Sequence, residues 1–189
     1  MTEIPPDRFP KAWQEFRSTG RVTESRVRAF PEYTDAIFPL AEEVGIQLVP
    51  AAAWTQEIAD SRDKALINIS KDEGRKAEWG EHQAAQKAYG AAVAGRSDDP
   101  IFIHSREYDS IVAKAQAPYQ SYFEKDLGPG GWLAINQAHL ALINGALDKV
   151  SGQNQVIVIT FGSWHKYMLI NGLMKRNDVV LRDSTSLFR

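Results

Sequence analysis

The chain has 189 residues, of which 43% are hydrophobic and 24% charged, as is typical of a globular protein. Its net charge of −2 excludes a strongly basic surface for nucleic acid or for an anionic membrane, and the absence of cysteine excludes disulfides and thiolate metal sites. The N-terminal residues lack the pattern of a signal peptide, and no apolar run approaches the ~20 residues of a membrane span. We therefore expect a cytoplasmic protein.

The order of the expected elements favours an α/β fold in one domain. Residues 1–30 are interpreted as an N-terminal helix and linker, and residues 31–183 as the α/β core. We expect a mostly helical, three-layer-like domain around a small, mainly parallel sheet of about three or four strands. A βαβ unit closes the chain at its C-terminal end.

In the first half of the core, glycines and prolines divide the apolar segments. A helix with a C-terminal stop at Gly45 leads into the apolar run 46–50, which predicts a strand. The segment from Thr55 to about Gly95 is mostly helical, with a break near 72–74. The sequence IFIHS that follows predicts either a short strand or an extended connection.

The second half contains the clearest periodicity. A helix kinked at Pro118 precedes GPGG at 128–131, which resembles a phosphate loop in composition but follows no strand. An amphipathic helix then leads into QVIVITF at 155–161, a continuous apolar run typical of a buried parallel strand. A helix and a shorter strand at 178–183 complete the predicted βαβ unit.

The sharpest candidate site is Gly162-Ser163-Trp164-His165, where the best predicted strand turns into a helix. Ligands of open α/β sheets bind at that edge, and the N–H groups of a first helical turn can hold an anion. The positive end of the helix favours a neutral His165, the form needed for a general base or a metal ligand. In the alternative interpretation, His165 only caps the turn while Trp164 and Tyr167 pack.

Three further side chains are candidates for the same site. Asn136 and His139 lie one turn apart on the preceding helix, where they either converge on His165 or form a satisfied core network. His104 follows the apolar residues IFI and is either a further metal ligand or an exposed loop histidine. His82 lies among polar residues of a helix face and is not assigned to the site.

The segment VIVITFGSWHKYMLINGLMKRNDVVL resembles the C-terminal half of the TraB, ChaN and erythromycin-esterase-like superfamily. Gly162 and His165 match the G-x-x-H motif that follows a late strand in these proteins. The resemblance covers residues 31–183, and the members of this superfamily include proposed metal-dependent proteases, hydrolytic esterases and a haem-binding lipoprotein. The family's first strand and first G-x-x-H motif have no counterpart here, because the first 45 residues contain no histidine and no apolar strand run.

Two functional hypotheses follow. In the first, the domain is a hydrolase in which His165 acts as a general base or binds a divalent metal ion such as Mn²⁺, Co²⁺ or Zn²⁺, with Asn136, His139 or His104 in support. A single histidine seldom holds a metal ion, so this hypothesis requires a second ligand. In the second, the domain is a non-catalytic module that binds a small molecule or peptide, or forms a homodimer through an unpaired sheet edge.

Overall fold

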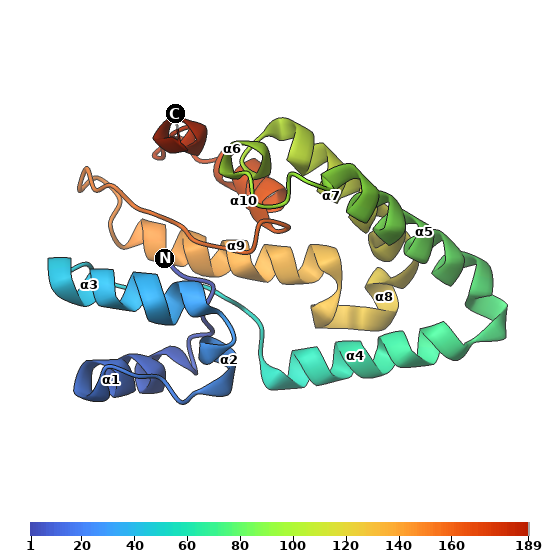
Figure 1. Cartoon of the computed structure of the whole chain (residues 1–189), viewed down its shortest axis with the longest axis horizontal. Helices are drawn as coiled ribbons and strands as arrows, with labels where there is room; N and C mark the ends of the chain where they lie inside the picture. Colours follow the sequence, from blue (N-terminus) through green and yellow to red (C-terminus); the bar gives the residue numbers. More distant parts are fainter. Residues whose placement is uncertain (189) are drawn as a thin grey trace. The chain divides into compact units, whose positions relative to one another are not determined.

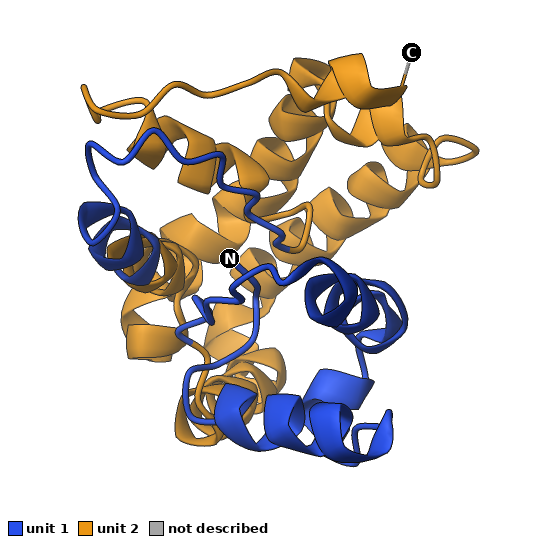
Figure 2. Ribbon diagram, turned by 90° about the vertical axis from the view of Figure 1, so that its left-hand side faces the viewer, with its two compact units in different colours: residues 1–53, 142–161 blue, residues 54–141, 162–189 orange. Residues whose placement is uncertain are grey.

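The computed structural model describes residues 1–188, and helices dominate the chain (Figure 1). It forms two compact units, which are coloured separately in Figure 2. Unit 1 comprises Met1–Ala53 and Leu142–Phe161, and unit 2 comprises Trp54–Ala141 and the described residues from Gly162 onward. The expectation of one domain stays a prediction.

Many of the helices follow one another directly or after short connections, whereas residues 45–55 and 149–165 form longer ones. Unit 1 contains α1 (Phe9–Thr19), α2 (Ser25–Arg28), the π-helical turn η1 (Glu32–Ile37) and α3 (Phe38–Val44). Unit 2 contains α4 (Gln56–Lys71), η2 (Glu73–Arg75), α5 (Lys76–Val93), α6 (Pro100–Ile103), α7 (Arg106–Pro118), η3 (Tyr119–Phe123), α8 (Glu124–Leu127), η4 (Gly128–Gly130), α10 (Lys166–Leu173) and η5 (Ser184–Phe188). Helix α9 (Trp132–Asp148) begins in unit 2, and its residues from Leu142 are assigned to unit 1.

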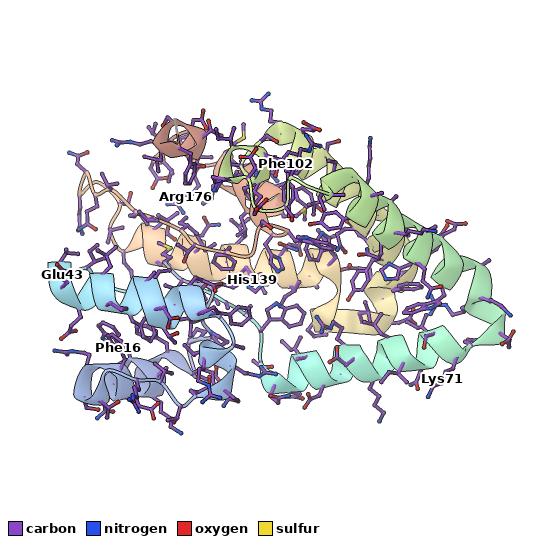
Figure 3. The ribbon with its side chains drawn as sticks, in the orientation of Figure 1. Phe16, Glu43, Lys71, Phe102, His139 and Arg176 are labelled. Carbon is purple, nitrogen blue, oxygen red and sulfur yellow. The ribbon has the colours of Figure 1, made fainter. Side chains whose placement is uncertain are left out.

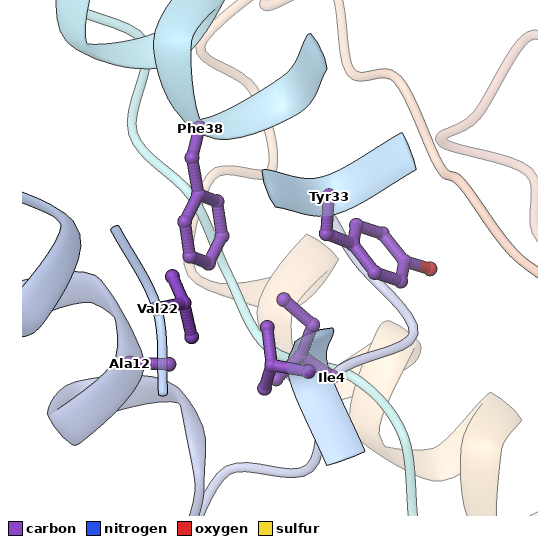
Figure 4. Packing of buried hydrophobic residues seen from close by; sticks show 6 residues of the cluster. Ile4, Ala12, Val22, Tyr33 and Phe38 are labelled. Carbon is purple, nitrogen blue, oxygen red and sulfur yellow. The ribbon is translucent and has the colours of Figure 1, made fainter. Parts of the chain in front are cut away.

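An aromatic and aliphatic cluster forms the core of unit 1. Phe38 is fully buried, and its ring makes edge contacts with the rings of Phe9, Trp13 and Phe16 on α1. Helix α1 ends at Gly20, whose left-handed φ of 70° lets its N–H donate to the Phe16 carbonyl at 2.7 Å. The buried members of the cluster, most of them labelled in Figure 4, are Ile4, Ala12, Val22, Val27, Tyr33 and Phe38.

Three extended segments of unit 1 meet at Thr2. This residue forms isolated parallel bridges with both Pro50 and Thr160. Its N–H donates to the Val49 carbonyl at 2.9 Å, and the Thr160 N–H donates to the Met1 carbonyl at 2.9 Å. The segments around residues 50 and 160 are therefore each paired with the N-terminal residues, but only at single bridges.

The predicted α/β class is wrong, because no residue in the range 1–188 belongs to a strand or sheet. The runs 46–50 and 155–161 are extended, as their β-branched composition favours. A strand also needs a continuous ladder of hydrogen bonds to a neighbour, and each run reaches Thr2 only through an isolated bridge. The predicted parallel sheet is therefore absent from the described residues.

The other two predicted strand segments, both in unit 2, are also not strands. The residues IFI lie in α6, because Pro100 starts that helix and the Asp99 carboxylate accepts the Ile101 N–H at 2.9 Å. Residues 178–183 form no strand, and the Val180 side chain is 90% exposed. The predicted C-terminal βαβ unit is thus replaced by one helix, α10, between two irregular segments.

Several helix ends in the two units lie where the sequence predicts them. Gly45 closes α3 in the left-handed conformation. The predicted break near 72–74 is also present, since the Asp72 carboxylate accepts the Gly74 N–H at 2.9 Å and starts η2. Beyond the break, α5 packs along α7. Among the buried residues of unit 2, Val93, Phe102, Tyr108 and Val112 form one cluster, and Ile69, Phe123 and Leu127 form another.

The GPGG segment shapes the start of α9. The Glu124 carboxylate accepts the backbone N–H groups of Leu133 and Ala134 at 3.0 and 2.8 Å. It therefore occupies the helix end that a phosphate group would otherwise use. A Cβ atom on Gly131 would lie 2.6 Å from Glu124 Oε1 and 3.0 Å from the Glu124 carbonyl oxygen, so a side chain at this position would displace the carboxylate that caps α9.

Gly131→Ala is expected to lower the free energy of unfolding by ~1–3 kcal/mol, because the added methyl group overlaps the carboxylate that caps α9. Gly145→Ala is the matched control on the same helix, since a Cβ atom at Gly145 meets nothing within 4 Å. The control should be neutral or stabilising by up to ~1 kcal/mol. Urea unfolding of both variants measures the difference, and equal stabilities would contradict the role of Glu124.

Candidate metal-binding site

A tight turn places His165 at the start of α10. The His165 N–H donates to the Gly162 carbonyl at 2.9 Å, and the His165 carbonyl accepts the N–H groups of Met168 and Leu169, each at 3.1 Å. The predicted glycine turn into a helix is therefore present, although no strand precedes it. The histidine thus occupies a fixed backbone position in unit 2.

Helix α9 presents three functional side chains toward this position. Trp132, Asn136 and His139 follow at i, i+4 and i+7, and so share one face of the helix. The Asn136 Oδ1 lies 2.9 Å from the His165 Nδ1, and the Trp132 ring stacks on the His165 ring at 4.9 Å between centroids and 21° between planes. His165 therefore has one ring face covered and one nitrogen engaged.

His139 brings a second imidazole to the site. It is labelled on α9 in Figure 3 and has no exposed surface. Its ring meets the His165 ring edge to face, with 4.9 Å between centroids, and the two histidines offer ring nitrogens within 4.8 Å of one another. The Trp54 ring meets the His139 ring edge to face, with 6.4 Å between centroids, and the Arg62 guanidinium lies over the Trp54 indole.

Close packing holds α10 against α9 within unit 2. A Cβ atom on Gly172 would overlap the Leu140 side chain, so the two helices approach closely at this point. Closer to the site, the Trp132 Nε1 donates to the Tyr167 hydroxyl at 2.8 Å. These contacts fix the position of α10 relative to Asn136 and His139.

Burial keeps both imidazoles neutral. It lowers the pKa of His165 to about 4, and burial together with the charge of a protonated His165 lowers the pKa of His139 to about 3. A neutral imidazole has an unprotonated nitrogen, which is what a metal ion or a transferred proton requires. Both histidines therefore have the protonation state of metal ligands at neutral pH.

Ser163 and Trp164 belong to an adjoining hydroxyl cluster. The Ser163 Oγ lies 2.7 Å from the Tyr108 hydroxyl, which lies 3.1 Å from the Tyr89 hydroxyl. The Trp164 Nε1 donates to Tyr89 at 2.9 Å. Burial raises the pKa of Tyr108 to about 12, so this phenol stays protonated. These contacts anchor the turn that carries His165.

The other two histidines have different partners. The His104 Nδ1 lies 3.0 Å from the Ser184 Oγ, and the His104 ring stacks on Phe188 at 5.4 Å. His82 packs among aromatic rings, including Phe123 at 5.7 Å, rather than lying on a polar face. Of the predicted metal ligands, the structure thus brings together His139 and His165, and it places His104 in a separate set of contacts.

Sequence reasoning missed two contributors to the site. Trp132 is not among the residues predicted for the site, although its spacing of four residues from Asn136 places both on one helix face. Tyr108 is 55 residues from its partner Ser163, and no local pattern links them. The first could have been found from helical periodicity, whereas the second depends on tertiary packing.

Comparisons of the chain with protein-family models, with curated proteins and with solved structures find no match. The resemblance to the TraB, ChaN and erythromycin-esterase-like superfamily therefore stays a prediction. Among the helices of residues 1–188, none combines the length and apolar character needed to cross a membrane.

The two buried histidines are expected to make the fold sensitive to acid. Their pKa values are lowered in the folded chain, so between pH ~6.5 and ~4 the unfolded state binds protons that the folded state does not. Stability should be full above pH ~6.5 and fall below it by ~1.4 kcal/mol per pH unit for each histidine. Urea unfolding across this range measures how steeply the free energy of unfolding depends on pH. The double variant that combines His139→Gln and His165→Gln should show a shallower dependence.

NMR titration of the histidine ring protons in the unaltered protein provides a second measurement. Two histidines with pKa values well below the usual value of ~6.5 would agree with the burial of His139 and His165. A pKa near ~6.5 for all four histidines would contradict the burial of His139 and His165.

Proposed function

We propose that unit 2 binds a divalent transition-metal ion through His139 and His165 and uses this site for hydrolysis. The observation that carries the proposal is the meeting of two buried, neutral imidazoles whose nitrogens lie within 4.8 Å of one another. Metal–imidazole bonds are ~2.0–2.1 Å long, so this separation is within reach of one ion after a small ring movement. His139 thus supplies the second ligand that the sequence-based hypothesis required.

The donor set favours borderline metals. The chain has no cysteine, and imidazole nitrogen suits Zn²⁺, Co²⁺, Ni²⁺ or Cu²⁺ better than Mg²⁺ or Ca²⁺. When bound, such an ion lowers the pKa of a coordinated water molecule toward neutrality, which supplies a nucleophile for hydrolysis. In this proposal, Trp132 covers one face of His165 and Asn136 restrains its ring. The proposed location is the cytoplasm.

Metal titration tests the proposal directly. The unaltered protein should bind Zn²⁺ or Co²⁺, and bound Co²⁺ should give the visible absorption of a nitrogen-ligated site. His165→Ala and His139→Ala should each weaken binding at least ~10-fold, which corresponds to ~1.4 kcal/mol. His82→Ala and His104→Ala are matched controls that should bind as the unaltered protein does, because these histidines have other partners.

The metal site would be contradicted if the unaltered protein bound no metal ion. It would also be contradicted if both His139→Ala and His165→Ala bound the metal ion as tightly as the unaltered protein. Circular dichroism of each variant shows whether it has folded. For hydrolysis, the metal-loaded protein should cleave activated esters faster than His165→Ala mixed with the same metal. Equal rates would contradict the hydrolytic role.

A second candidate function is self-association through unit 1, favoured by the exposure of an uncharged extended segment. Val156 and Val158 are 73% and 69% exposed, and residues 153–163 contain no charged side chain that would oppose pairing. Two identical segments can pair with each other about a two-fold axis, so the proposed partner of this segment is the same segment in a second copy of the chain.

The self-association proposal predicts a dimer whose population rises with protein concentration in light-scattering measurements. Val156→Lys combined with Val158→Lys should give a monomer, because lysine side chains on an extended segment disfavour its pairing with another chain. Val180→Lys, at a side chain that is 90% exposed in unit 2, is the matched control and should leave the dimer intact. A monomeric unaltered protein at high concentration would contradict this role.

A further inference from the structure

Asn136 is placed so that the backbone decides which way its side-chain amide points. Its Nδ2 lies 2.7 Å from the Trp132 carbonyl oxygen, one turn earlier on α9, and the residue is 2% exposed. A carbonyl oxygen can only accept a hydrogen bond, so the amide nitrogen must face it. The reverse orientation would bring two acceptor oxygens together in a buried environment, at a large cost in free energy.

The orientation of this amide then determines the proton position on His165. With Nδ2 directed at Trp132, the atom that faces the His165 Nδ1 at 2.9 Å is the amide oxygen Oδ1, which accepts but cannot donate. The Nδ1 must therefore carry the proton. We infer that Asn136 is a positioning residue that holds His165 in the Nδ1–H tautomer and thereby makes Nε2 the nitrogen that binds the metal ion.

Two features make this more than a local hydrogen bond. A neutral imidazole in water favours the opposite tautomer, with the proton on Nε2, so the protein selects the less common form. The Trp132 ring, stacked on His165 at 21° between planes, restrains ring rotation while its own carbonyl orients Asn136. Trp132 and Asn136 therefore fix both the plane and the proton of His165 from one face of α9.

The consequence for metal affinity rests on the proposed function, whereas the tautomer itself does not. Partners that orient a ligating histidine typically change metal affinity by ~10–100-fold when they are removed. In this site, the loss of Asn136 should let the proton move to Nε2, and the metal ion would then have to displace it. Asn136 would thus govern metal affinity without touching the ion.

Nitrogen NMR of uniformly labelled, metal-free protein at neutral pH tests the tautomer without any substitution. His165 should show a pyrrole-type Nδ1 and a pyridine-type Nε2. The reverse pattern in the unaltered protein would overturn the inference. If the expected pattern is seen but Zn²⁺ does not bind, the tautomer stands and only the proposed function fails.

Asn136→Leu tests whether the amide is responsible. This substitution keeps a similar side-chain volume but removes the acceptor, so the Nε2–H form should appear and Zn²⁺ affinity should fall ~10–100-fold. Gln137→Leu, at the exposed neighbouring position on α9, is the matched control and should change neither measurement.

An unchanged tautomer in Asn136→Leu would assign the proton position to another group and overturn the role of Asn136. Circular dichroism and the amide NMR spectrum establish whether each variant is folded. If Asn136→Leu does not fold, the measurement on the unaltered protein still tests the inference.

Discussion

The contact between α9 and α10 in unit 2 is the constraint on which the candidate site depends. Gly172 gives the two helices room to approach at Leu140, and the pair Trp132–Tyr167 ties them together closer to the site. Because α10 begins directly after His165, any shift of this helix moves the imidazole away from Asn136. The hydrogen bond and the ring stack on His165 are therefore consequences of helix packing.

Burial gives the site its chemical character. A charged imidazolium is costly to desolvate, so a buried pair of histidines is stable only when both rings are neutral. The same burial that makes the fold sensitive to acid therefore provides the unprotonated nitrogens of a metal site. Stability and metal binding are expected to fail over overlapping pH ranges, because both require neutral His139 and His165.

The sequence was most informative where local chemistry decides the structure. Gly45 ends α3 and Asp72 breaks the long helical segment, since a left-handed glycine and a carboxylate capping a nearby N–H act within a few residues. The shared helix face of Asn136 and His139 also follows from spacing alone. Spacing alone did not decide whether these two side chains meet His165 or form a separate core network. Tertiary packing decides this, because His165 lies 29 residues after Asn136.

The predicted strands failed for a physical reason. A run such as QVIVITF reports a preference for extended backbone, but a sheet exists only when a neighbouring segment supplies a continuous ladder. In unit 1, the N-terminal residues offer isolated bridges at Thr2, and in unit 2, the Pro100 and Asp99 signals convert IFI into a helix. The segment that would pair with a strand can be far away in the sequence, and a capping residue can turn an apolar run into a helix. The composition of the run alone reveals neither effect.

X-ray absorption at the zinc edge of the metal-loaded protein identifies the atoms that coordinate the ion. We expect a coordination shell that contains two imidazole nitrogens at ~2.0–2.1 Å, with the outer-shell scattering typical of histidine rings. His165→Ala should reduce that contribution to one ring or prevent zinc from being retained. A shell of oxygen atoms alone in the unaltered protein, without imidazole scattering, would contradict the assignment of His139 and His165 as ligands.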